Sequence, residues 1–115
     1  MLALSSATRY FLYEQPTDMR YGIQALAGIV RNKLGFDPMS GDVFIFIGKR
    51  GDQIRLLQWD QDGFALYIKR LERGTFERPR SSKSLLSSRE LGLLLQGVRL
   101  ESVRYRKRYM AAGRQ

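Results

Sequence analysis

Two aspartates separated by one residue, Asp60 and Asp62, are the first candidates for catalysis in this sequence. A pair of carboxylates can transfer protons or hold magnesium ions, as in nucleases. These two lie in the segment DQDG (residues 60–63), between two apolar runs, where aspartate is favoured because its side chain hydrogen-bonds the nearby backbone. We therefore interpret Asp60 and Asp62 as turn residues and keep a small metal-dependent nuclease as a third hypothesis.

Other catalytic groups are scarce. The 115 residues contain no Cys and no His, which removes thiolate nucleophiles, disulfides, Cys-based zinc sites and the usual proton shuttle at neutral pH. The segment GKRGD (residues 48–52) lacks the spacing of a phosphate-binding loop, and no serine lies in a nucleophile-elbow pattern. The sequence therefore predicts a protein that is not an enzyme, with no catalytic residue, no cofactor and no bound metal.

Positive charge is unevenly distributed along the chain. Residues 1–66 hold 7 Lys/Arg and 7 Asp/Glu, whereas residues 67–115 hold 13 Lys/Arg and 4 acids, which accounts for the whole net charge of +9. A basic half beside a neutral half is typical of a protein that binds a polyanion, and nucleic acid is the most abundant one. The alternative is a basic, partly disordered tail that serves only solubility.

Seven cations lie near the ends of two expected strands, residues 43–50 and 64–72. These are the first and third strands of an antiparallel meander, so they run the same way and their ends lie at one edge of the sheet. Guanidinium groups contact phosphates bidentately, and the alternative is an ordinary solvated rim. The predicted nucleic-acid-binding residues in this patch are Lys49, Arg50, Lys69, Arg70, Arg73, Arg78 and Arg80.

The segment RYRKRY (residues 104–109) adds four cations and two tyrosines in six residues. Arginine with tyrosine is suited to phosphates and to stacking on bases, although basic tails are common and also occur without a function. We expect Arg104, Arg106, Lys107 and Arg108 to contact nucleic acid.

Hydrophobic periodicity predicts the elements of the N-terminal half. Residues 8–15 are β-branched and aromatic and predict a short strand. Apolar residues then recur at three- and four-residue spacing, which predicts a helix capped by Thr17 or Asp18 and ended by Gly35. Residues 43–50 are apolar on both sides of the strand, which is typical of a covered central strand.

The second half predicts two more strands and one helix. Residues 53–60 and 64–72 form strands around a turn in which we expect Gly63 to take a positive φ. After an exposed loop, a helix begins at a capping box formed by Ser87 and Glu90, and Gly97 stops it. The helix residues expected to dock on the sheet are Leu91, Leu94, Leu95 and Val98.

These elements predict an α+β fold in which two helices pack on a three- to four-stranded antiparallel meander sheet. We expect one domain over residues 1–100 and a basic, possibly disordered tail over residues 101–115. No apolar run reaches the roughly 18–20 residues that span a bilayer, and the N-terminus lacks the pattern of a secretory signal. A cytoplasmic protein without membrane contact is expected.

Several segments together resemble a known family. They are residues 16–30 (PTDMRYGIQALAGIV), 37–46 (DPMSGDVFIF) and 56–79 (LLQWDQDGFALYIKRLERGTFERP), followed by 87–98 (SSRELGLLLQGV). Their order is similar to that of the TnpB (Orf2) accessory proteins of the insertion-sequence 66 family of bacterial transposable elements. One departure is Arg78, where the family usually has Trp before the proline.

The resemblance implies participation in transposition beside a separate transposase, which supplies the strand-cutting carboxylates. Our leading hypothesis is a non-catalytic accessory protein that binds DNA, at the transposon ends, through the basic surface. The alternative is an adaptor that binds the transposase through an apolar sheet face and does not contact DNA. Its motivating feature is the strand at residues 43–50, which needs cover on both faces.

Overall fold

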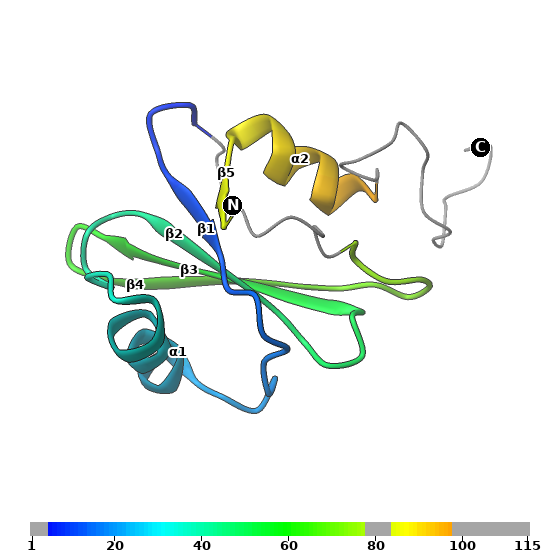
Figure 1. Ribbon diagram of the computed structural model, residues 1–115, viewed down its shortest axis with the longest axis horizontal. Coiled ribbons are helices and arrows are strands. Elements are labelled where there is room, and N and C mark those ends of the chain that lie inside the picture. Colours follow the sequence, from blue (N-terminus) through cyan, green and yellow to red (C-terminus); the bar gives the residue numbers. More distant parts are fainter. Residues whose placement is uncertain (1–4, 78–83, 98–115) are drawn as a thin grey trace.

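The structure, a computed structural model, describes residues 5–77 and 84–97. Its centre is a five-stranded sheet in the order β4-β3-β2-β1-β5, with one helix packed on each face (Figure 1). The α+β fold class is therefore confirmed. The elements in chain order are β1 (Tyr10–Leu12), α1 (Ile23–Ile29), the π-helical turn η1 (Val30–Leu34), β2 (Val43–Ile47), β3 (Gln53–Asp60), β4 (Gly63–Arg70), β5 (Leu85–Leu86) and α2 (Ser88–Gln96).

The meander of β2, β3 and β4 is confirmed. Strand β3 pairs antiparallel with both neighbours, from Val43↔Gln58 to Ile47↔Ile54 on one side and from Gln53↔Arg70 to Asp60↔Gly63 on the other. The connections are too short for a crossover, so only antiparallel pairing is open to these strands.

The expectation of a purely antiparallel sheet of three to four strands is wrong at the other end of the sheet. Strand β1 pairs parallel with β2, because the intervening α1 and η1 carry the chain back to the start of the sheet. Strand β5 then pairs antiparallel with β1 and adds a fifth strand. It falls in a segment expected to be loop, since two residues are too few to show a strand period.

Strand β2 is the most deeply buried element. All five of its residues are buried, which confirms the expected central strand. Phe44 and Phe46 face the cluster under α1, whereas Val43, Ile45 and Ile47 face the cluster under α2. The two hydrophobic clusters therefore meet at this strand, and the chain covers both of its faces itself.

The start of the first helix differs from the expectation. Helix α1 begins after Gly22 without a side-chain cap, so the predicted caps at Thr17 and Asp18 are wrong. Residues 17–22 are instead held as a loop along the end of β2, where Thr17 forms a parallel bridge with Gly48. The end of the helix is as expected, because Gly35 follows η1 in the left-handed conformation with φ 73°.

The second helix confirms the local signals in its sequence. The Ser87 side chain accepts from the Glu90 N–H, and the Glu90 carboxylate accepts from the Ser87 N–H, while Gly97 ends α2 with φ 91°. Leu91 and Leu94 are buried against the sheet and Leu95 packs at its margin. Val98 lies outside the described residues. No helix in the described ranges is long and apolar enough to cross a membrane.

In the turn between β3 and β4, the residue with a positive φ is not the expected one. Gln61 has φ 60°, and the Asp62 N–H donates to the Asp60 carbonyl at 2.6 Å, which is the pattern of a γ-turn. The expected positive φ at Gly63 is wrong, because Gly63 already belongs to β4 and pairs with Asp60. A left-handed backbone costs a residue with a Cβ roughly 1–2 kcal/mol.

We predict that Gln61→Gly stabilises the protein by about 0.5–1 kcal/mol, because relief of this strain exceeds the added entropy of the unfolded chain. Gly63→Ala is the matched test, since a Cβ there meets no atom within 4 Å. It should leave stability unchanged or slightly higher. Urea denaturation measures both. A loss of more than about 1 kcal/mol in Gly63→Ala would show that the strain lies at Gly63 after all.

Candidate nucleic-acid interface

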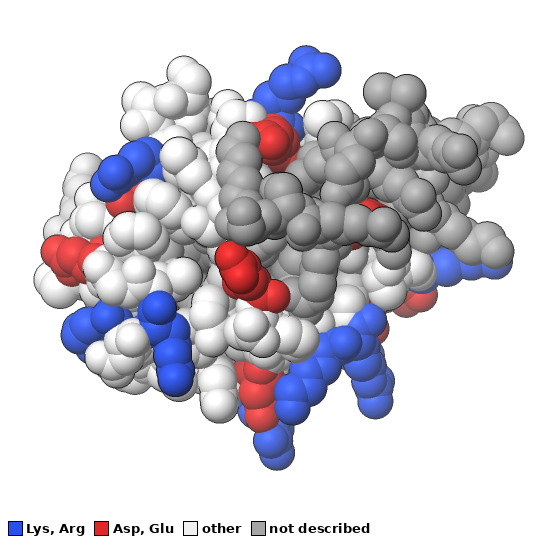
Figure 2. Space-filling view, viewed as in Figure 1, with Lys and Arg blue, Asp and Glu red and all other residues white. Residues whose placement is uncertain are grey.

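An open hollow of about 410 Å³ lies where the loop before α1, the β2–β3 turn and the end of β4 meet. Figure 2 shows Lys and Arg side chains gathered along the lower edge of the molecule, over the β2–β3 turn and the loop before α1. Four cations and two acids are among the residues that line the hollow: Thr17, Asp18, Met19, Arg20, Gly48, Lys49, Arg50, Asp52, Gln53 and Arg70.

The loop before α1 is fixed against the end of β2 by backbone contacts. The Thr17 N–H donates to the Ile47 carbonyl at 2.9 Å, and Thr17 is 2% exposed. A Cβ at Gly48 would lie 2.7 Å from the side-chain Cγ of Met19, so a larger residue there would force the Met19 side chain to move. The loop thereby forms one wall of the hollow.

The β2–β3 turn forms the floor and carries two of the cations. The Gly51 N–H donates to the Gly48 carbonyl at 3.0 Å, and Gly51 itself has φ 79°. Its carbonyl accepts from the Phe76 N–H at 2.7 Å, which ties the turn to the segment after β4. Lys49 and Arg50, between these two glycines, are exposed.

The third wall is the end of β4. Arg70 pairs in register with Gln53, and the next residue, Leu71, donates its N–H to the Asp52 carbonyl at 2.7 Å. The ends of β2 and β4 therefore lie together, as the meander predicts. The structure brings three of the predicted binding residues into one hollow: Lys49, Arg50 and Arg70.

One acid of the hollow is neutralised locally. The Arg20 guanidinium contacts both carboxylate oxygens of Asp18, with Nη2 at 2.6 Å from Oδ2, and the Arg20 N–H also donates to Oδ1. These hydrogen bonds hold the pKa of Asp18 well below its usual range and raise the pKa of Arg20. The pair stays ionised and contributes no net charge at neutral pH.

The other cations of the hollow form no ion pair with the residues that the structure describes. In the described part of the chain only two ion pairs form, Arg9–Asp42 and Arg20–Asp18, and both use cations of the electrically neutral N-terminal half. Among residues 5–77 and 84–97, no carboxylate lies within 4.0 Å of Lys49, Arg50 or Arg70. Asp52 is the remaining acid in the lining, so the hollow keeps a positive surplus.

Lys69 lies on the opposite face of the sheet from Arg70. Its Nζ donates to the Leu95 carbonyl at 3.3 Å, in the last turn of α2. The last carbonyls of a helix are unpaired and carry partial negative charge, so a cation there stabilises the helix end. Lys69 therefore joins β4 to α2 and does not line the hollow.

Of the other predicted binding residues, the structure describes only some. Arg73 is exposed in the segment after β4 but is not part of the hollow lining. Six predicted binding residues lie outside the described residues, namely Arg78, Arg80, Arg104, Arg106, Lys107 and Arg108. Their contact with nucleic acid stays a prediction.

Two further side chains that could contact nucleic acid have internal partners. Nη1 of Arg55 donates to the Tyr21 carbonyl at 2.6 Å and so holds the loop before α1 onto β3. The ring of Trp59 packs edge-to-face on Phe64, with 5.1 Å between ring centroids. Both residues stabilise the face of the sheet that carries α1.

Asp60 and Asp62, the residues of the nuclease hypothesis, are exposed at the tip of the β3–β4 turn. Across residues 5–77 and 84–97, no group of three or more His, Cys, Asp or Glu side chains is placed to hold a metal ion. The geometry therefore gives the nuclease hypothesis no support.

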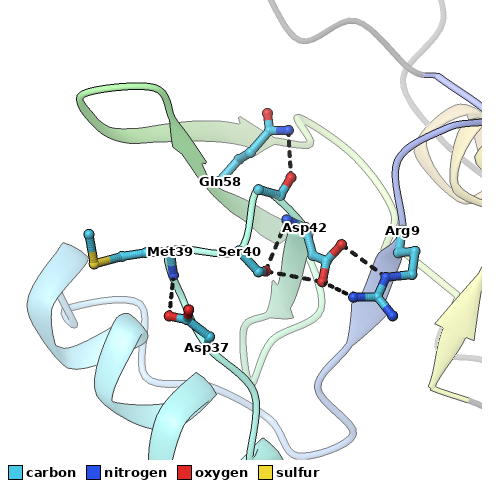
Figure 3. A network of polar contacts seen from close by, with 7 residues as sticks. Arg9, Asp37, Met39, Ser40, Asp42 and Gln58 are labelled. Atoms are coloured by element: carbon cyan, nitrogen blue, oxygen red, sulfur yellow. Dashed lines mark hydrogen bonds and ion pairs between the residues drawn. The ribbon is translucent and has the colours of Figure 1, made fainter.

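A second polar cluster holds the loop of residues 37–42 (Figure 3). Arg9 binds Asp42 bidentately, with Nε to Oδ1 at 3.1 Å and Nη2 to Oδ2 at 2.8 Å, and Ser40 donates to the same carboxylate. The Gln58 side chain donates to the Gly41 carbonyl at 3.0 Å. Asp42 is 8% exposed, so this network anchors the start of β2 between β1 and β3 and is structural.

Sequence reasoning missed Arg20 as a residue of the site, because it was assigned to the first helix. The signal was available in the segment TDMR (residues 17–20), where an acid two residues before an arginine can bind it in a tight loop. Asp18 and Arg20 form this contact, and the helix begins only at Ile23.

Fold and hollow together define a small α+β fold whose sheet carries a surplus of positive charge at one end, among the described residues. The profile of the family described as IS66 Orf2 like protein matches residues 8–105. The chain belongs to this family, which places it among the transposition-associated accessory proteins.

Two similar proteins come from Sinorhizobium fredii (strain NBRC 101917 / NGR234). The uncharacterized protein y4jC is 37% identical over 100 residues, which cover 85% of this chain and 86% of that protein. The uncharacterized protein y4hO is 33% identical over 100 residues, which cover 85% of this chain and 87% of that protein. No solved structure matches the chain.

We predict that Lys69→Met lowers the free energy of unfolding by about 0.5–1 kcal/mol, because the end of α2 loses its cation. The control is Lys49→Met, which removes the same charge from an exposed residue that forms no hydrogen bond or ion pair in the described part of the chain, and it should change stability by less than about 0.5 kcal/mol. Thermal or urea denaturation measures both. Equal losses in the two variants would contradict the structural role of Lys69.

Proposed function

We propose that this chain is a non-catalytic accessory protein of DNA transposition that binds DNA through its basic hollow and assists a separate transposase. The observation that supports this most strongly is the placement of Lys49, Arg50 and Arg70 in one hollow, where none of them forms an ion pair with a described residue. Cations that are free in the folded protein keep their charge available for phosphate, and each neutralised phosphate releases counterions.

The form of the hollow suits the DNA backbone. Two arginines and a lysine project from a turn and a strand end, and guanidinium groups bind phosphate bidentately. Phosphate contacts position a protein on DNA but carry no sequence information by themselves. We therefore expect the hollow to bind DNA of any sequence with similar affinity. Preference for the transposon ends would have to come from other contacts or from the transposase.

The remaining predicted cations extend this proposal beyond the hollow. Arg73 lies three residues after the end of β4 and is exposed. The cations of residues 78–80 and 104–108 would add phosphate contacts, and the tyrosines of the tail would stack on bases. Lys69 is not included, since its ammonium binds the end of α2.

The adaptor alternative, in which the chain binds the transposase without DNA, loses its motivating feature. It rested on a central strand that needed cover on both faces, and the two clusters under α1 and α2 provide that cover. A pull-down with the transposase that survives neutralisation of Lys49, Arg50 and Arg70, in a chain that fails to shift DNA, would favour the adaptor.

We predict that affinity for DNA falls steeply with salt. If six phosphates are engaged, log K falls with log salt at a slope near −5. The double variant Lys49→Ala/Arg50→Ala should make the slope about 2 units shallower, because two phosphate contacts are lost. An electrophoretic shift with the element's terminal repeats and with random DNA, run across a salt series, measures the slope.

The matched control is Arg31→Ala/Lys33→Ala. It removes the same pair of charges from exposed residues of η1, which lie outside the hollow, so it should leave the slope unchanged. Equal changes in both double variants would show that net charge alone drives binding. An affinity that ignores salt would refute the proposal.

A further inference from the structure

Strand β4 is an edge of the sheet formed by residues 5–77 and 84–97. It is the first strand in the order β4-β3-β2-β1-β5, and among the described residues it pairs only with β3. The other edge strand, β5, has 2 residues, whereas β4 has 8 in an unbroken register with β3. Short strands, bulges, prolines and charged side chains are the usual protection of an edge, and β4 has only the charges of Lys69 and Arg70 at its end.

The middle of β4 is apolar and incompletely covered. The segment GFALYI (residues 63–68) carries no charge, and none of the eight residues of β4 is buried. Ile68 is 49% exposed, on the same side of the strand as the partly buried Phe64 and Leu66. An apolar edge of this length is suited to pairing with another strand.

The backbone groups that such a partner would meet follow from one hydrogen bond. The Leu71 N–H donates to the Asp52 carbonyl, so Leu71 points its backbone polar groups toward β3. Direction alternates along an antiparallel strand, so Lys69 and Tyr67 also point toward β3. The polar groups of Phe64, Leu66 and Ile68 therefore point outward from the sheet.

We propose that two copies of this chain associate by antiparallel pairing of their β4 strands, with Leu66 opposite Leu66 of the second copy. This register joins residues whose backbone polar groups point outward. Phe64 pairs with Ile68 of the second copy, and Ile68 pairs with Phe64 of the second copy. Three such pairs exchange six hydrogen bonds. The two sheets then form one continuous sheet around a two-fold axis.

Side chains on both faces support this register. Asp62, in the turn directly before β4, comes next to Arg70 of the second copy at the end of the seam; Arg70 is exposed and forms no ion pair among the described residues. On the other face, the small Ala65 comes opposite the large Tyr67. A shift of two residues would place Arg70 opposite Phe64 and lose both charge pairs. The strand is thus complementary to itself in charge and in size, which favours a second copy over another protein.

The dimer would place two basic hollows on the same face of the joined sheet. The two-fold axis is perpendicular to the sheet, and the two Arg70 residues are eight positions apart along the seam, which is about 27 Å. The association itself does not depend on DNA. Failure of the DNA experiments above would leave it standing, and the reverse also holds.

The first test is the mass of the full chain without DNA, by sedimentation or light scattering over a concentration series. We expect a species of twice the 13.3 kDa of one chain. Asp62→Arg and Arg70→Asp should each weaken the dimer at least about tenfold, because each places like charges opposite one another at two equivalent positions. The double variant Asp62→Arg/Arg70→Asp should restore the dimer. All three variants change only exposed residues, so we expect each of them to fold.

The second test uses the absence of cysteine from the natural chain. Leu66→Cys should form an intermolecular disulfide under mild oxidation, because paired Cα atoms lie about 5.5 Å apart. Ile68→Cys is the matched control on the same face. Its two copies would be four positions apart along the seam, about 14 Å, so no disulfide should form.

A monomer at all concentrations, or a dimer that ignores both charge reversals, would overturn the proposal. Efficient cross-linking of Ile68→Cys in place of Leu66→Cys would overturn the register. A chain that is monomeric alone, yet loses transposase binding in Leu66→Lys, would assign the β4 edge to the transposase and refute self-pairing.

Discussion

The burial of β2 on both faces is the constraint on which the rest of this structure depends. A strand of Val, Phe and Ile without a polar residue has no solvent side, so the chain must supply two layers of cover. The first layer comes from α1 and η1, and the second from α2 with Phe76 and Leu86. Each layer comes from a different part of the chain, which explains why α1 and α2 lie on opposite faces of the sheet.

The position of the basic hollow follows from the same strand. The loop of residues 17–20 reaches it through the Ile47 carbonyl and the close contact at Gly48, and the meander carries Arg70 back to the same end. A change that loosens the end of β2 would therefore separate the walls of the hollow even if every cation were kept. The Arg9–Asp42 pair performs the corresponding task at the start of β2.

Sequence patterns predicted the elements that depend on local signals. The capping box at Ser87, the glycine stops at Gly35 and Gly97, and the boundaries of β3 are all local, and all are confirmed. The parallel β1–β2 pair and β5 were missed, because strand order depends on distant contacts and two residues show no period. The wrong prediction of the α1 cap has a similar cause. Asp18 could accept hydrogen bonds either from the N–H groups at the start of a helix or from Arg20 in its own loop, and in the structure it binds Arg20.

Prediction of the candidate site from the positions of cations in the sequence has the same limit. A count of cations assigned Lys69 and Arg70 to one surface, although neighbouring residues of a strand point to opposite faces. The alternation was visible in the sequence, but which face held α2 was not. Lys69 binds the end of that helix, whereas Arg70 keeps its charge free. Adding up positive charge therefore overestimates a binding surface unless the internal partners of each cation are known.

Arg70 lies at the junction of the two surfaces proposed for this chain, so DNA binding and self-association would be coupled through it. In a dimer, pairing with Asp62 of the second copy would reduce the charge that Arg70 offers to phosphate. Each hollow would then lose at most one phosphate contact, which makes the slope of log K against log salt about 0.9 shallower. Two hollows on one particle raise the effective affinity for a long duplex by a factor of about 10²–10⁴ when both can engage. The second effect is larger at physiological salt, so the net coupling is positive. Because coupling between binding equilibria is reciprocal, DNA long enough to reach both hollows would also stabilise the dimer, whereas a short duplex would not.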